Sequence, residues 1–157
     1  MRNILIAYTS MTGNTEELAE IAKVVLTGRG FDVTVKTFDA EAIAAKEFLA
    51  YDGILFGTYT YDDGNLPYEI EETYDDLDTV SFTDKVVGVF GSGDSCYYEF
   101  CHATDLMAEK FTEVGAHVVD SIVKVDLDAQ QADVDRMQAM VNMFCDAIDQ
   151  RLEDSCA

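Results

Sequence analysis

The residues best suited to binding chemistry lie in a short polar segment near the N-terminus, residues 9–16. It reads Thr-Ser-Met-Thr-Gly-Asn-Thr-Glu, with five hydroxyl or amide side chains and no lysine or arginine. A helical pattern follows, and the free backbone N–H groups at the start of a helix, together with hydroxyl donors, bind phosphate well. The segment therefore predicts a site for a monophosphate that is held by neutral donors without a metal ion.

The same segment has a simpler interpretation as a polar helix cap that binds nothing. It lacks the Gly-Lys-Ser/Thr of a nucleoside-triphosphate loop and the spaced glycines of a dinucleotide-binding loop. Taken alone, it leaves both the phosphate site and the plain helix cap open.

Two further segments, residues 57–67 and 91–101, combine glycine with aromatic and acidic residues. Aromatic side chains from two separate loops could hold a flat ring between them, and such stacking contributes about 0.5–1.5 kcal/mol beyond burial. Single tyrosines in loops more often serve packing. Two such loops beside a phosphate loop nevertheless favour a site for a ring that carries a phosphate.

Short apolar runs precede all three polar segments, at residues 4–7, 53–57 and 86–91. They do not alternate with polar residues, which is typical of parallel strands that helices cover on both faces. Two weaker runs, residues 31–35 and 116–119, each follow a glycine and predict two more strands. We therefore expect five buried strands.

Helical periodicity lies between the strands, at residues 15–27, 106–114 and 134–148, and an acidic helix is expected after Pro67. The order β-α repeated five times predicts an α/β fold, a doubly wound five-stranded parallel sheet with helices on both faces. One domain should span residues 1–157. In such a sheet, ligands bind at the carboxyl ends of the strands, where the three polar segments lie.

The chain carries 31 acidic and 10 basic residues, for a formal net charge of −21. This charge argues against binding to nucleic acid or to an anionic membrane surface, and it would attract a basic protein partner. It could equally serve only to keep the chain in solution, or adapt it to salt. No apolar stretch approaches the roughly 20 residues that a membrane span needs.

The four cysteines, Cys96, Cys101, Cys145 and Cys156, show no metal-binding spacing. With only His102 and His117 beside them, we expect no metal site, and reduced thiols in a cytoplasmic protein. Neither histidine has a partnered acid or serine in the polar segments, so we expect no catalytic residue.

The segment Ser10–Thr15, directly after an apolar strand that starts at residue 3, resembles the FMN-phosphate loop of the flavodoxin family. The Gly-Ser-Gly-Asp of residues 91–94 stands at the right interval, and the resemblance covers nearly the whole chain. No long insertion interrupts residues 116–128, which is similar to the short-chain members. The resemblance implies a strand order of 2-1-3-4-5 and a low-potential one-electron carrier with non-covalently bound FMN.

The resemblance also implies a role for each loop around the flavin. Tyr61 and Tyr97 would stack on the inner and outer ring faces, and residues 58–60 would contact the ribityl chain and phosphate. Residues 92–94 would contact the pyrimidine edge of the flavin ring, and residues 100–101 would complete the site at this edge. The implied cofactor-binding residues are Ser10, Met11, Thr12, Gly13, Asn14, Thr15, Thr58, Tyr59, Thr60, Tyr61, Asp62, Ser92, Gly93, Asp94, Tyr97, Phe100 and Cys101.

Asp62 departs from the pattern because the family commonly has glycine at this position. In the family, the peptide after the inner aromatic residue rotates on one-electron reduction, and glycine permits the positive φ of that motion. We expect Asp62 to make the one-electron-reduced state less stable here by about 1 kcal/mol.

The implied partners are a flavin- or iron–sulfur-containing reductase and redox acceptor proteins, and this chain should be a monomer. They would meet an acidic face formed by Asp62, Asp63, Glu69, Glu72, Asp94 and Glu99. The main alternative is an FMN quinone or azo reductase on the same scaffold, which Tyr97 stacked on the outer ring face would obstruct. An activator of a metalloenzyme and a flavin-free phosphate-binding module are further alternatives.

Overall fold

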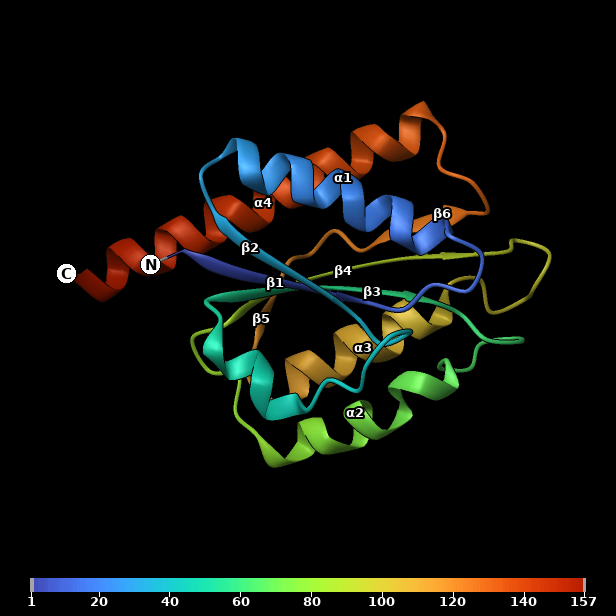
Figure 1. Cartoon of the computed structure of the whole chain (residues 1–157), viewed down its shortest axis with the longest axis horizontal. Helices are drawn as coiled ribbons and strands as arrows, with labels where there is room; N and C mark the ends of the chain where they lie inside the picture. Colours follow the sequence, from blue (N-terminus) through green and yellow to red (C-terminus); the bar gives the residue numbers. More distant parts are fainter. Residues whose placement is uncertain (1, 157) are drawn as a thin grey trace.

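A computed structural model describes residues 2–156, with side chains up to residue 154. Its centre is one sheet with the strand order β2-β1-β3-β4-β5, and every strand pair is parallel (Figure 1). The strands are β1 (Asn3–Tyr8), β2 (Asp32–Thr37), β3 (Gly53–Tyr59), β4 (Val86–Gly93), β5 (His117–Val118) and β6 (Val123–Asp126). The predicted fold class and strand order are confirmed.

The prediction of five strands was wrong at the last one, which is split into β5 and β6. Both pieces pair with β4: Val86 faces His117, and Phe90 faces Val123. From Val86 to Phe90, β4 advances by four residues, whereas the paired edge strand advances by six, from His117 to Val123. Two extra residues of the edge strand therefore bulge out of the ladder. Such a bulge bends an edge strand and interrupts its pairing.

The helices form two layers, one on each face of the sheet (Figure 1). Helices α1 and α4 cover one face, whereas α2, α3 and the short 3₁₀ helices cover the other. The helices are α1 (Asn14–Gly28), η1 (Ala45–Ala50), η2 (Tyr68–Ile70), α2 (Glu71–Asp76), η3 (Leu77–Thr79), α3 (His102–Glu113) and α4 (Gln131–Cys156). The acidic helix expected after Pro67 is present, but as η2, α2 and η3 in succession.

The predicted β-α order was also wrong between the second and third strands, where only the six-residue 3₁₀ helix η1 is present. The large buried side chains of this connection are those of Phe38, Ile43 and Phe48. They recur every five residues, whereas a regular helix needs apolar positions three to four apart. The segment therefore crosses the face of the sheet without forming an α-helix.

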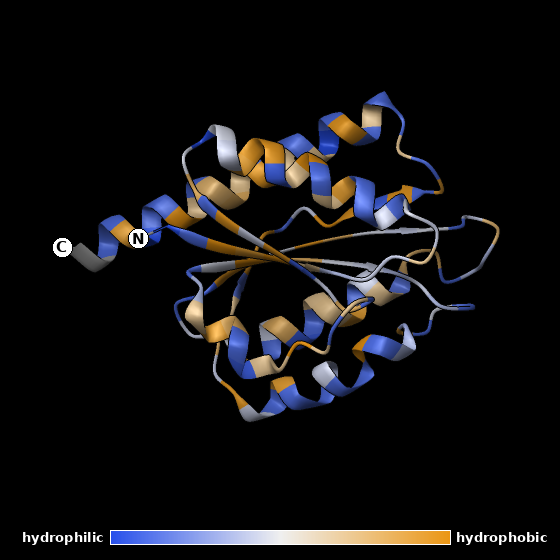
Figure 2. Cartoon of the chain, viewed as in Figure 1, coloured by the Kyte–Doolittle hydropathy of each residue, from blue (hydrophilic) through white to orange (hydrophobic). Residues whose placement is uncertain are grey.

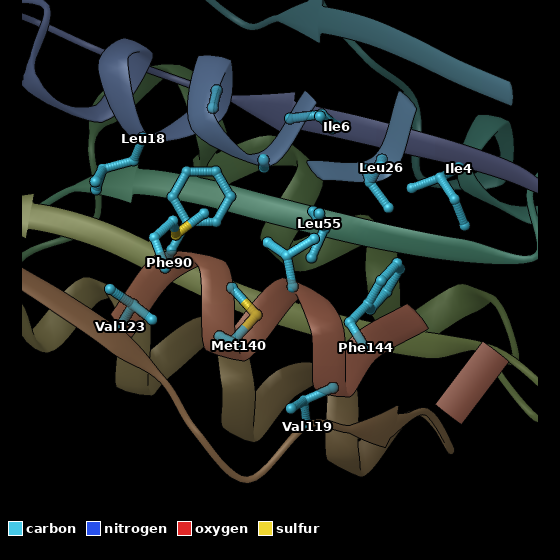
Figure 3. Packing of buried hydrophobic residues seen from close by; sticks show 14 of the residues in the cluster. Ile4, Ile6, Leu18, Leu26, Leu55, Phe90, Val119, Val123, Met140 and Phe144 are labelled. Atoms are coloured by element: carbon cyan, nitrogen blue, oxygen red, sulfur yellow. The ribbon is translucent and has the colours of Figure 1, made fainter. Parts of the chain in front are cut away.

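Apolar side chains fill the space between the sheet and both helical layers (Figure 2). On the α1–α4 side, Leu55 and Phe90 from the sheet pack with Met140 and Phe144 of α4, all fully buried (Figure 3). On the other side, the rings of Phe48, Phe56, Phe82 and Phe111 contact one another at centroid distances of 5.4–6.4 Å. These two clusters fix the central strands, and hence the positions of their carboxyl ends.

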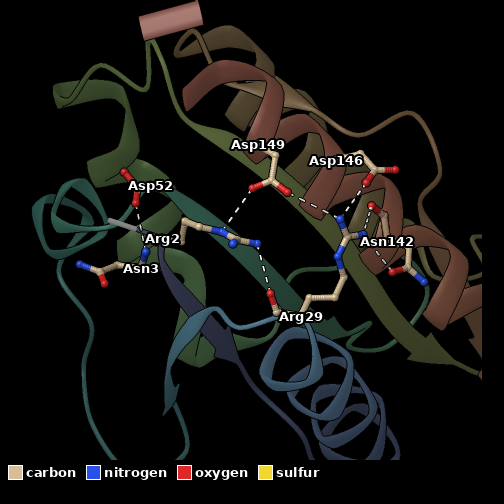
Figure 4. A network of polar contacts seen from close by, with 7 residues as sticks. All are labelled: Arg2, Asn3, Arg29, Asp52, Asn142, Asp146 and Asp149. Carbon is tan, nitrogen blue, oxygen red and sulfur yellow. Dashed lines mark hydrogen bonds and ion pairs between the residues drawn. The ribbon is translucent and has the colours of Figure 1, made fainter. Parts of the chain in front are cut away.

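A polar network fastens the opposite, amino-terminal edge of the sheet (Figure 4). The Arg2 guanidinium lies 3.2 Å from the Asp149 carboxylate, and Arg29 donates to Asp146 at 2.9 Å and to Asn142 at 3.1 Å. The network joins β1 and the end of α1 to α4. Two of the chain's few basic side chains, Arg2 and Arg29, therefore form ion pairs with α4 at the edge of the sheet opposite the polar loops.

Within residues 2–156, the structure contains no helix that combines the length and apolar character needed to cross a membrane.

Candidate functional site

The segments after β1, β3, β4 and β6 converge at the carboxyl edge of the sheet around a hollow of about 130 Å³. Its walls are formed by Met11, Thr12, Asn14, Tyr59, Thr60, Asp62, Ser92, Gly93, Asp94, Tyr97, Glu99, Cys101 and Leu127. A larger hollow of about 610 Å³, between the end of α4 and the start of β4, carries none of the predicted residues. Most of the predicted cofactor-binding residues therefore lie at the smaller hollow.

The segment from Ser10 to Thr15 folds into the first turn of α1. Gly13 precedes the helix with φ at +93°, a backbone conformation that favours glycine. The Ser10 Oγ atom accepts the backbone N–H groups of Gly13 at 3.1 Å and Glu16 at 3.3 Å. The Ser10 hydroxyl oxygen thus accepts two N–H groups at the start of α1, which are donors of the kind that bind phosphate at a helix N-terminus.

The segment after β3 forms a tight turn between Tyr61 and Asn65, whose backbones exchange two hydrogen bonds of 2.8 and 2.9 Å. Within this turn, Asp62 has φ at +50° and Gly64 has φ at +97°. Thr60 uses its hydroxyl oxygen to accept the Ala103 N–H at the start of α3. The turn is therefore fixed to α3, and Asp62 adopts a left-handed conformation that Asp tolerates better than bulkier residues.

The segment after β4 is held by two aspartates. The Asp94 carboxylate accepts the Cys96 N–H at 3.0 Å, and this hydrogen bond lowers the pKa of Asp94. The Ser95 N–H and hydroxyl donate to Asp126, at the end of β6, at 3.0 and 2.6 Å. The Asp94 carboxylate, which was predicted to contact the edge of the flavin-like ring, thus already accepts a hydrogen bond from within the chain.

The two ring-binding segments are also joined to each other, because the Glu99 N–H donates to the Asp63 carboxylate at 2.9 Å. Near this junction β4 and α3 approach so closely that a Cβ on Gly93 would lie 2.9 Å from Cys101 Sγ. Cys101 itself is buried, and desolvation raises the pKa of its thiol to about 12. Cys101 is therefore a packing residue with an unreactive thiol.

Six of the predicted residues do not line the hollow: Ser10, Gly13, Thr15, Thr58, Tyr61 and Phe100. Thr15 and Thr58 are completely buried, and Thr58 donates its hydroxyl hydrogen to the Tyr59 carbonyl. Tyr61, which is 52% exposed, lines a neighbouring hollow with Leu66 and Tyr68. Of the two predicted ring-stacking tyrosines, only Tyr97 lies at the hollow.

Two wall residues were not predicted as cofactor contacts, Glu99 and Leu127. Leu127 follows β6, has φ at +57° and donates its N–H to the Gly93 carbonyl at 2.8 Å. The rule that ligands bind at the carboxyl ends of strands applies to the last strand too, so it would have pointed to Leu127. Glu99 was predicted only as a residue of the acidic face.

The walls of the hollow carry negative charge, because they include Asp62, Asp94 and Glu99 and no lysine or arginine. Tyr59 also lines the hollow. Burial raises the pKa of its phenol, and the hydrogen bond from this phenol to Glu69 adds to the effect. Within the described part of the chain, no group of three or more histidine, cysteine and acidic residues could hold a metal ion.

Comparison with known proteins agrees with this geometry. The family model described as flavodoxin matches residues 6–138. The chain is 38% identical to probable flavodoxin 2 of Bacillus subtilis over 130 residues, which cover 80% of this chain and 83% of the relative. Over 145 residues it is 34% identical to probable flavodoxin 1 of the same organism, covering 92% and 90%.

Among solved structures, the flavodoxin of Streptococcus pneumonia TIGR4 matches with a TM-score of 0.87 and 39% identity, covering 92% of this chain and 99% of that one. A short-chain flavodoxin associated with a PDU bacterial microcompartment matches with a TM-score of 0.89 and 32% identity, covering 94% and 99%. The chain therefore belongs to the flavodoxin family, and it is an FMN-binding electron carrier rather than an enzyme that turns over a substrate.

Proposed function

We propose that the chain is a single domain that carries one electron at a time, at low potential, on FMN held non-covalently at the hollow. The observation that carries this proposal is the convergence of the segments after β1, β3 and β4 on one hollow at the carboxyl edge. The bound flavin supplies the redox chemistry, and the protein supplies binding and electrostatics.

The FMN phosphate would bind at residues 10–15. The first turn of α1 offers backbone N–H groups without intrahelical partners, and the helix dipole favours an anion there. Ser10 and Thr12 add hydroxyl groups, while the hollow offers no lysine or arginine. These donors suit a phosphate monoester and fit FMN.

The flavin ring would lie between the loops that follow β3 and β4. Ligand sites usually measure about 300–1,000 Å³, so a hollow of about 130 Å³ must widen to admit the ring. Tyr97 is 44% exposed and Tyr61 is 52% exposed, so both side chains have room to turn. We expect Tyr97 to stack on the outer ring face and Tyr61 to rotate out of its own hollow onto the inner face.

The surrounding carboxylates support a low potential. Asp62, Asp94 and Glu99 line the hollow, and their negative charge disfavours additional charge on a reduced ring. The hydrogen bond from the Cys96 N–H lowers the pKa of Asp94 and so favours the charged form of this carboxylate.

The partners would be flavin- or iron–sulfur-containing reductases and acceptor proteins that present a basic face. Asp62, Asp94 and Glu99 line the hollow. Asp62, Asp63 and Glu72 are exposed, and Asp94 and Glu99 are half-buried. Electron-transfer complexes are small and transient, so charge steering matters more than buried area. Glu69 is the exception on this face, because its carboxylate faces inward onto Thr9 and Tyr59.

We also propose a monomer in the cytoplasm that binds neither nucleic acid nor a membrane surface. A net charge of −21 opposes self-association and repels both polyanions. Cys96, Cys101 and Cys145 are free thiols, which supports a reducing compartment.

Stepwise anaerobic reduction of the FMN-loaded protein, followed by visible spectroscopy, tests the carrier function. We expect two separate one-electron steps, and no bleaching when NADPH is added alone. A single two-electron step, or rapid bleaching by NADPH, would favour a reductase instead.

Electron transfer from the reduced protein to a basic c-type cytochrome tests the acidic face. The double variant Asp63→Asn/Glu72→Gln should transfer electrons several-fold more slowly at low ionic strength, and the difference should fade with added salt. A matched control, Glu20→Gln/Glu109→Gln, removes two exposed carboxylates elsewhere and should behave like the parent protein. Equal slowing of both variants would indicate that only the net charge matters.

A further inference from the structure

The buried hydroxyl of Thr9 lies between two carboxylates that come from distant parts of the chain. Thr9 is completely buried, and its Oγ1 atom lies 2.8 Å from Asp39 Oδ1 and 2.6 Å from Glu69 Oε2. Asp39 follows β2, and Glu69 lies in η2. Thr9 itself immediately precedes the phosphate-binding segment, so these contacts act on the start of that segment.

Asp39 also binds the backbone of this segment directly. Its Oδ2 atom accepts the Ser10 N–H at 2.9 Å and the Thr37 hydroxyl at 2.9 Å. The Thr9 N–H donates to the Gly57 carbonyl at 3.0 Å. The chain entering the phosphate-binding segment is therefore held by β3 on one side and by Asp39 on the other.

Glu69 extends the connection to the ring-binding segment, because the Tyr59 phenol donates to its Oε2 atom at 2.9 Å. Tyr59 ends β3 and lines the hollow. The Thr9 cluster, formed by Thr9, Asp39, Tyr59 and Glu69, thus joins the segments after β1, β2 and β3. Within residues 2–154, neither Asp39 nor Glu69 forms a salt bridge, so hydrogen bonds alone hold the cluster together.

We propose that Thr9, Asp39 and Glu69 are positioning residues that fix the phosphate-binding segment relative to the ring-binding segment, and so set the preference for FMN over riboflavin. None of the three lines the hollow, so they act through the loops they hold. Riboflavin lacks the phosphate, so misplacing residues 10–15 should weaken its binding much less than that of FMN. The inference rests on the phosphate position proposed above.

The Thr9 hydroxyl has a single hydrogen, so it donates to one carboxylate at a time and the two compete for it. A glutamine at position 69 would remove the competition, because its amide can donate to Thr9 Oγ1 while Thr9 donates to Asp39. Glu69→Gln should therefore retain the preference for FMN, whereas Glu69→Ala should lose it.

Dissociation constants for FMN and for riboflavin, measured by flavin-fluorescence quenching on the apoprotein, test the proposal. Thr9→Val should weaken FMN binding about tenfold or more, the scale of a hydrogen bond to a charged group, while riboflavin affinity stays within about twofold. Thr9→Ser should restore FMN binding. Thr73→Val is the matched control. Thr73 lies in α2 and is another buried threonine, and its hydroxyl donates to the Ile43 carbonyl.

Equal weakening of both flavins by Thr9→Val, or no weakening of either, would overturn the proposal. Loss of FMN preference in Glu69→Gln to the same extent as in Glu69→Ala would also overturn it. Thr12→Val distinguishes a failure of the proposed phosphate position from a failure of the positioning role of Thr9. If Thr12→Val leaves the preference for FMN intact, the phosphate lies elsewhere. If Thr12→Val removes the preference and Thr9→Val does not, only the positioning role fails.

Discussion

The Thr15 hydroxyl lies 2.7 Å from the Ser92 hydroxyl, in a contact buried between the first turn of α1 and the end of β4. These residues are 77 positions apart in the sequence. The contact ties the phosphate-binding segment to the strand that carries the second ring-binding loop. It therefore links stability and cofactor binding at one point.

Ser92→Ala should lower the free energy of unfolding of the apoprotein by about 1 kcal/mol, because Thr15 loses its partner while remaining buried. It should also weaken FMN binding, since Ser92 lines the hollow. Urea unfolding measures the first effect. Ser81→Ala removes an exposed hydroxyl that contacts Thr83, and should change stability by less than about 0.5 kcal/mol. Equal effects of the two variants would contradict a special role for the Thr15–Ser92 contact.

Asp62→Gly should widen the gap between the two one-electron potentials by about 40–90 mV. Glycine should stabilise the one-electron-reduced state by about 0.5–1 kcal/mol, which raises the first potential and lowers the second by about 20–40 mV each. The effect depends on a change of backbone conformation at Asp62 on reduction, because the cost of its present φ of +50° is common to all redox states. A redox titration of the FMN-loaded protein measures the gap. Asp62→Asn keeps an αL-tolerant residue and removes the charge. A shift in Asp62→Asn as large as that in Asp62→Gly would assign the effect to charge.

Cys96 should be the one fast-reacting thiol of the native protein in a Cys156→Ser background. Cys96 is exposed, whereas burial raises the pKa of Cys101 to about 12 and that of Cys145 to about 11. Hydrogen bonding to Asp94 raises the pKa of the Cys96 thiol as well. Asp94→Asn should therefore lower that pKa and speed thiol modification near neutral pH several-fold.

The rate of modification by a disulfide reagent between about pH 7 and 10 measures this shift. Asp120→Asn, which neutralises another exposed carboxylate, should leave the profile unchanged. An identical profile for the parent protein and Asp94→Asn would show that Asp94 does not act on the thiol.

Lys110→Met should destabilise the protein by about 1 kcal/mol near neutral pH, because Lys110 joins α3 to Asp78 at 2.7 Å and lies over the Tyr74 ring. The hydrogen bond to Asp78 raises the pKa of Lys110 above its unfolded value. The contribution is therefore complete below the unfolded pKa of about 10.4, and is lost as pH rises through the folded pKa. Unfolding free energies of both proteins from neutral to alkaline pH measure it. A constant difference above pH 10 would contradict this account.

The strand order and the individual cofactor contacts were implied by the resemblance to the flavodoxin family. The residues themselves predicted the buried strands and the three polar segments at their carboxyl ends. These features depend on local chemistry. An uninterrupted apolar run marks a strand buried on both faces, and the polar residues before a helical pattern mark its first turn. Gly13 illustrates this, because glycine is the residue type that most easily adopts the positive φ found at the start of α1.

Features that depend on contacts between distant residues could not be predicted. Tyr61 stands at the predicted position in the sequence, yet it lines a neighbouring hollow together with Leu106 of α3, which is far away in the sequence. The break in the last strand depends on its register against β4, which no local pattern encodes.

The inward orientation of the Glu69 side chain could not be predicted for the same reason. In the sequence, Glu69 is one acid among many in a helix, and it was predicted to lie on the acidic face. In the structure, it meets Thr9 across 60 residues of sequence, while Asp39 meets Thr9 across 30. The sequence by itself determined which chemical groups stand at the carboxyl edge, because residue type and local conformation are encoded locally. Only the tertiary structure decided which of these groups face the cofactor site and which hold its loops, because that depends on the packing of segments far apart in the chain.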